Sequence, residues 1–136
     1  MTLRQAQLIG RLTALGFSWE EANAIRRVEM TLHRWAEAEC GDGNDFASWA
    51  IERDEETGVP YRCVYPHAGK CTRTRIADRE RGALRRLEAI LANHPDWTYY
   101  HQGDPRGCAL YLVRKDELKP GDRLDSVYTR GIAIAA

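Results

Sequence analysis

Residues 99–113 read YYHQGDPRGCALYLV, two largely apolar arms joined by a short charged turn. In this turn the Asp104 side chain can bond back to the backbone, and Pro105 fixes the first central position of a type I turn. The arm at 108–113 is apolar on both of its alternating faces, which is typical of a strand covered on two sides. The stretch therefore predicts a hairpin in the core sheet, with its second arm away from the sheet edge.

Extended segments on either side of this hairpin predict further strands. From Phe46 the chain alternates through Trp49 and Ile51, and the segment 54–58, DEETG, forms a turn. The alternating residues of the return arm are Tyr61, Cys63 and Tyr65. A last strand is predicted within 126–135, SVYTRGIAIA.

Three segments carry helix signals. Thr2 with Gln5 has the spacing of a capping box, and Gly16 offers a left-handed stop. Ser18 with Glu21 repeats the box before a stripe that continues to about residue 38 and consists of Ile25, Val28, Leu32 and Trp35. Asp78 is the predicted N-cap of the third helix, whose inward positions are Ala83, Leu84, Leu87, Ile90 and Leu91.

The element order is then ααββαβββ. A chain of 136 residues with 43% hydrophobic residues is long enough for one domain with its own core. We therefore predict a single α+β domain over 1–136, with three helices packed on an antiparallel sheet of about four to five strands.

Composition and charge narrow the functional classes. Twenty basic and twenty acidic residues give zero net charge, so the chain as a whole lacks the electrostatic footprint of a dedicated nucleic-acid binder. The first residues lack the apolar core of a signal peptide, and no apolar run reaches membrane-spanning length. We expect a cytoplasmic protein without a membrane partner, whose four cysteines stay thiols or bind metal.

Several longer phrases carry a family resemblance. They are MTLHRWAEAECGDGND (30–45), IERDEETGVPY (51–61), DRERGALRRL (78–87), GDPRGCALYLV (103–113) and YTRGIAI (128–134). Over Phe17 to Ile134 the chain resembles a small, widespread family of uncharacterised proteins from tailed bacteriophages and prophages. The resemblance implies an accessory protein acting in the bacterial host cell, in a pool that includes host-takeover factors and inhibitors of defence systems. It supplies no catalytic motif.

The segment 69–86, GKCTRTRIADRERGALRR, is strongly basic, whereas 37–56 is rich in acid. Arginine forks can hold phosphates or a partner's carboxylates. The candidate binding residues are Arg73, Arg75, Arg79, Arg85 and Arg86. The alternative is a solvated helix face whose charges pair within the molecule.

Arg106 lies at the tip of the opening hairpin, beside Asp104. An arginine on a rigid tip is preorganised for contact with a partner, and arginine is enriched at interface hot spots. An exposed turn residue paired with Asp104 is the alternative interpretation.

Cys63, His67 and Cys71 have the spacing C-x3-H-x3-C, and His33 and Cys40 lie seven residues apart on the second helix. Together they could supply nitrogen and sulfur ligands to a structural zinc ion. The alternative makes the cysteines small buried hydrophobes, with no cofactor.

Three hypotheses about function remain. The first is a non-enzymatic accessory protein that binds a host protein or ribonucleoprotein through its arginines; exposed aromatic residues would also permit a homodimer. The second is a small nucleic-acid-binding regulator that uses the basic segment and the third helix. The third is an enzyme, either a hydrolase using Cys108 and His101 or a metal-dependent nuclease. The candidate nuclease carboxylates are Asp42, Asp45, Glu52, Asp54, Glu55 and Glu56.

Overall fold

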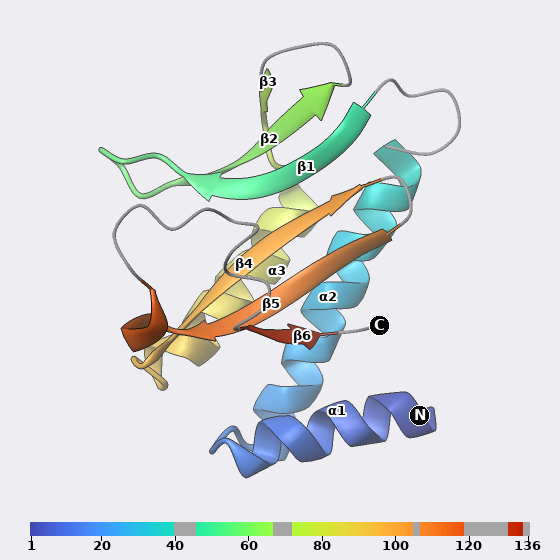
Figure 1. Cartoon of the computed structure of the whole chain (residues 1–136), viewed down its shortest axis with the longest axis vertical. Coiled ribbons are helices and arrows are strands. Elements are labelled where there is room, and N and C mark those ends of the chain that lie inside the picture. The colour runs from blue at the N-terminus through green and yellow to red at the C-terminus, as the bar shows by residue number, and fades with distance from the viewer. Residues whose placement is uncertain (40–45, 67–71, 105–106, 119–130, 135–136) are drawn as a thin grey trace.

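The computed structural model describes residues 1–39, 46–66, 72–104, 107–118 and 131–134. These residues form three α-helices, six strands and one 3-10 turn (Figure 1). The helices are α1 (Leu3–Ala14), α2 (Trp19–Glu39) and α3 (Asp78–Ala92). The strands are β1 (Phe46–Arg53), β2 (Pro60–Pro66), β3 (Thr72–Thr74), β4 (Trp97–Asp104), β5 (Gly107–Arg114) and β6 (Ile132–Ile134), and the 3-10 turn is Lys115–Glu117.

The strands form one antiparallel sheet in the order β3-β2-β1-β4-β5-β6. Two hairpins, β1–β2 and β4–β5, meet in the middle, where β1 pairs with β4 and Ile51 lies opposite His101. In the opening hairpin Asp104 pairs with Gly107 across the turn, and β5 lies between β4 and β6. The predicted α+β class, the core hairpin and the internal position of its second arm are confirmed.

The observed order is ααβββαβββ, one strand more than predicted. The additional strand is β3, three residues long, within the segment interpreted as a basic connector. Its sequence, Thr-Arg-Thr, has no apolar alternation, and its burial is low because it lies at the sheet edge. Pairing with residues 62–64 of β2 makes it a strand.

The helix ends follow the predicted local chemistry in two of three cases. Thr2 and Gln5 exchange both capping-box hydrogen bonds, as do Ser18 and Glu21. Gly16 has a φ of 105°, which an L side chain would adopt only with strain.

At α3 the predicted cap is wrong by one residue. Ala77 occupies the N-cap position and Asp78 is the first helical residue. The backbone N–H of Ala77 donates instead to the Glu80 carboxylate, which satisfies a donor at the start of the helix without a capping side chain.

The helices pack on one face of the sheet, and α1 crosses the N-terminal end of α2 (Figure 1). Ile25, Val28 and Leu32 of α2 are fully buried, and they belong to one core cluster with Leu110 and Leu112 of β5. All five predicted inward positions of α3 are also buried. The core therefore sits between the sheet and α2 and α3.

Polar groups are buried within this helix-covered side. Arg62 of β2 forms an ion pair with Glu80 of α3, and both side chains are almost completely excluded from solvent. The Arg62 guanidinium lies 3.8 Å from the ring centre of Trp35 on α2. The pair joins β2 to the start of α3.

His101 of β4 is buried beside this pair. Neither ring nitrogen has a hydrogen-bond partner among the described residues, and burial lowers the pKa of His101 well below its ordinary value of 6.5. Electrostatic interactions with Arg62 and His33 lower this pKa further. The imidazole is therefore neutral at pH 7.

This burial predicts a pH-dependent stability. Below pH 6.5 the unfolded chain protonates His101 while the folded chain does not, so the free energy of unfolding falls as the pH falls. We expect His101→Leu to show a smaller loss of melting temperature between about pH 7.5 and about pH 5.5 than the wild type. Thermal melts of both proteins at both pH values test this. An equal loss of melting temperature in the wild type and the variant would contradict it.

Candidate functional site

A pocket of about 490 Å³ opens where the edge of the sheet meets α3. Its walls carry four arginines, which are Arg73, Arg75, Arg81 and Arg85. Its apolar lining comes from Val59, Pro60, Ile76 and Leu84. We call this site the arginine pocket; its volume lies in the usual range for small-molecule sites.

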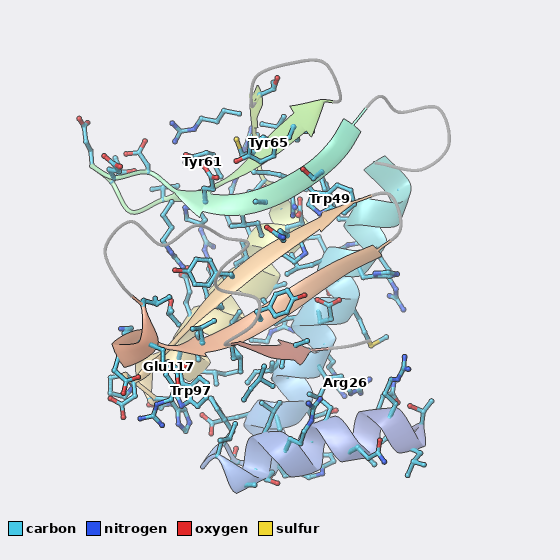
Figure 2. All side chains as sticks on the ribbon, in the orientation of Figure 1. Arg26, Trp49, Tyr61, Tyr65, Trp97 and Glu117 are labelled. Atoms are coloured by element: carbon cyan, nitrogen blue, oxygen red, sulfur yellow. The ribbon has the colours of Figure 1, made fainter. Side chains whose placement is uncertain are left out.

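Arg73 is held in place by the β1–β2 hairpin. From β3 its guanidinium lies 3.7 Å from the centre of the Tyr61 ring and 2.9 Å from a carboxylate oxygen of Asp54. The hydrogen bond from Arg73, with those from the backbone N–H groups of Thr57 and Glu56, lowers the pKa of Asp54 to about 2. Figure 2 labels Tyr61 on β2 beside the hairpin end. The contacts with Tyr61 and Asp54 therefore hold Arg73 in one wall of the arginine pocket.

The helix supplies the opposite wall. Arg81, Leu84, Arg85 and Glu88 recur three or four residues apart, so they share one flank of α3. Arg81 donates a hydrogen bond to the carbonyl of Ile76 over 3.3 Å and lies 3.4 Å from exposed Asp78. Arg81 therefore connects the β3–α3 segment to the helix.

Two arginines of the pocket have no matching charge among the residues that the structure describes. Arg75 and Arg85 are exposed and make no ion pair or hydrogen bond within the part of the chain that the structure describes. The pocket carboxylate, Glu88, accepts a hydrogen bond from Arg53 over 2.6 Å and one from the Tyr99 hydroxyl over 3.2 Å. Arg53 forms an ion pair with Glu88 and so matches its charge. Since Arg53 itself lies outside the pocket lining, the charges of the pocket arginines are not matched by Glu88, and the pocket is cationic.

The structure brings three of the predicted binding residues together in this pocket. Arg73, Arg75 and Arg85 line it, whereas Arg79 and Arg86 are exposed on another flank of α3. Asp104 ends β4, but its side chain lies outside the described part of the structure, as does all of Arg106. The hairpin-tip hypothesis stays a prediction.

One part of the metal hypothesis needs correction. Cys63 is buried on β2 and disulfide-bonded, so the expectation that the four cysteines stay thiols or bind metal is wrong for Cys63, and its sulfur is not a free ligand. His33 is half-buried on α2 near His101. Residues Cys40, His67 and Cys71 lie outside the described residues. No group of three metal-ligating side chains occurs among the residues that are described.

A second, larger hollow of about 920 Å³ lies at the β1–β2 hairpin end and shares Tyr61 and Arg73 with the arginine pocket. It holds four of the predicted acids, which are Glu52, Asp54, Glu55 and Glu56. The two Glu52 oxygens accept hydrogen bonds from Tyr61 and Tyr65 over 3.2 and 2.8 Å, and Asp54 binds Arg73. The two other predicted acids, Asp42 and Asp45, lie outside the described residues. Two of the four acids in the hollow are therefore engaged by the chain itself.

The predicted thiol and imidazole also occupy different positions along the hairpin. His101 pairs with Leu110 and is buried, while Cys108 pairs with Gly103. The Cys108 side chain lies outside the described part of the structure. The imidazole faces the protein interior, where a substrate does not reach it.

Sequence reasoning missed Arg81 as a binding candidate and missed the apolar lining. The signal for Arg81 was its spacing of four residues from Arg85, which places both on one helix flank. Val59 and Pro60 gave no comparable signal, because they meet α3 only through the pairing of β1, β2 and β3.

Comparison of the chain with protein families, curated proteins and solved structures finds no match. Among the described residues no helix is both long and apolar enough to cross a membrane.

Proposed function

We propose that the chain is a non-enzymatic binding protein that holds an anionic macromolecule of a bacterial host through the arginine pocket. The observation that carries this proposal is the pair Arg75 and Arg85, which line a pocket and have no ion-pair or hydrogen-bond partner among the described residues. Exposed guanidinium groups are well suited to bidentate contacts with phosphates and carboxylates.

The candidate catalytic groups are either bound by neighbouring side chains or buried, and both make them less suited to catalysis. Glu52 and Asp54 are bound by neighbouring side chains in the acidic hollow, and His101 is buried in its neutral form. A general base must reach the substrate's proton, directly or through one water molecule. These positions favour binding over catalysis.

The resemblance to phage and prophage proteins supports a bacterial host as the source of the partner. In that setting, the proposed role is that of a host-takeover factor or an inhibitor of a defence system, acting in the cytoplasm of the host cell. A binding protein needs only a complementary surface for such a role, and the arginine pocket offers one.

Affinity capture tests this proposal. The full chain is used as bait in a lysate of infected or prophage-bearing bacteria, with and without nuclease, and captured protein and nucleic acid are identified. We expect Arg75→Gln/Arg85→Gln to reduce recovery of the partner by about tenfold or more, because two charged contacts are lost.

The matched control is Arg79→Gln/Arg86→Gln, which removes the same charge from another flank of the same helix. Recovery with this control should stay within about twofold of the wild type. Unchanged recovery with the pocket variant, at an unchanged melting temperature, would refute the arginine pocket as the binding site.

A further inference from the structure

The chemistry of the arginine pocket restricts which anion fits it. We infer that the pocket binds a nucleotide, with the phosphate at Arg75 and Arg85 and the base against the apolar lining. This inference rests on the proposed function, because it names the anionic group that the same pocket would hold.

The cationic side of the pocket favours a phosphate over a single carboxylate. Of the four arginines, Arg73 is matched by Asp54 and Arg81 lies near exposed Asp78, which leaves Arg75 and Arg85 without a counter-charge in the part of the chain that the structure describes. A carboxylate supplies one negative charge, whereas a phosphate monoester carries about −1.5 to −2 at pH 7 and has three acceptor oxygens. A phosphate can therefore match both guanidinium groups at once.

The apolar side of the pocket requires a ligand larger than phosphate. Val59, which is 58% exposed, and Pro60 line the pocket together with the buried residues Ile76 and Leu84. A free phosphate would leave this lining in contact with water. A flat ring attached to the phosphate would cover it, which adds apolar burial to the charged contacts.

The edge of the sheet provides polar groups suited to a base. Thr74 lies at the pocket on β3, which is the edge strand of the described sheet and has a strand neighbour only in β2. The outer side of an edge strand presents backbone N–H and C=O groups. A nucleobase has both donors and acceptors along its edge, whereas a phenyl ring has neither.

Calorimetric titration of the full chain at low salt tests the inference. The probes are inorganic phosphate, adenosine, phenyl phosphate, adenosine 5′-monophosphate and a 5′-phosphorylated hexanucleotide. We expect adenosine 5′-monophosphate to bind at least about tenfold more tightly than inorganic phosphate, adenosine or phenyl phosphate. Of these four probes, it alone can contact the arginines, the apolar lining and the strand edge together. If the hexanucleotide binds more tightly still, the ligand is the end of a strand; if not, it is a free nucleotide.

The variants locate the binding. Arg75→Gln/Arg85→Gln should weaken binding of adenosine 5′-monophosphate by about tenfold, while Arg79→Gln/Arg86→Gln should change it by less than about twofold. Absence of binding, equal binding of phosphate or phenyl phosphate, or equal loss in both variants would overturn the inference.

The two proposals fail separately. If Arg75→Gln/Arg85→Gln loses its captured partner but no nucleotide binds, the proposed function stands and the nucleotide inference falls. If nucleotides bind at the pocket but capture does not depend on these arginines, the nucleotide inference stands and the macromolecule-binding function falls.

Discussion

Arg62→Met should lower the free energy of unfolding by about 3–5 kcal/mol, the usual cost of leaving one partner of a buried ion pair without its counter-charge. Arg62 and Glu80 are 0% and 1% exposed, so water cannot replace the lost partner. The variant also removes the cation that lies over the Trp35 ring. Urea unfolding monitored by circular dichroism measures this change in the free energy of unfolding.

The double variant Arg62→Met/Glu80→Met provides the control. Replacing both partners of a buried pair by apolar residues is often close to neutral, so most of the lost stability should return. About 1 kcal/mol should stay lost, because Glu80 also accepts the hydrogen bond from the Ala77 backbone at the start of α3. A double variant as unstable as Arg62→Met would show that the ion pair is not the cause.

This buried pair also matters for the arginine pocket. Glu80 connects β2, through Arg62, with the backbone that precedes α3. Arg75 lies in the short segment between β3 and α3, and Arg85 lies one turn and a half beyond Glu80 on the helix. The interior ion pair therefore helps to set the distance between the two walls that carry the unmatched arginines.

Leu110→Ala should lower the free energy of unfolding by about 2–5 kcal/mol, through lost apolar burial and the cavity that remains. Leu110 is 0% exposed on β5, where it pairs with His101 on one side and Ile134 on the other. The surrounding strands and helices limit how far this site can collapse, which favours a large effect. Denaturant unfolding at constant pH measures it.

Leu3→Ala is the matched control, since it deletes the same atoms from a side chain that is 77% exposed on α1. The change in its free energy of unfolding should stay within about 0.5 kcal/mol. Similar losses in both variants would contradict the internal position of β5.

The predicted fold agrees with the structure where local chemistry decides the outcome. The capping pairs at Thr2 and Ser18 and the glycine after α1 depend on residues within one turn of each other. The opening hairpin likewise depends on a short turn between two apolar arms, and it forms at the predicted position, with Asp104 paired with Gly107. Strand β3 lacks such a signal, and it exists through pairing with β2.

The candidate site was predicted only in part for the same reason. Basic residues around the third helix were evident, but the sequence did not separate Arg85, which lines the pocket, from Arg86, which lies on another flank. Nor could it show that Arg73 is matched by Asp54, nineteen positions away in the chain. Both distinctions depend on which surfaces the fold brings face to face.

By itself, therefore, the sequence determined the helices, the two hairpins and the basic character of the segment before and within α3, because periodicity, capping and turn chemistry act over a few residues. The tertiary structure alone decided the six-strand order, the buried Arg62–Glu80 pair and the arginine pocket. Each of these depends on contacts between residues distant in the chain, and such contacts are fixed only when the sheet and helices pack together.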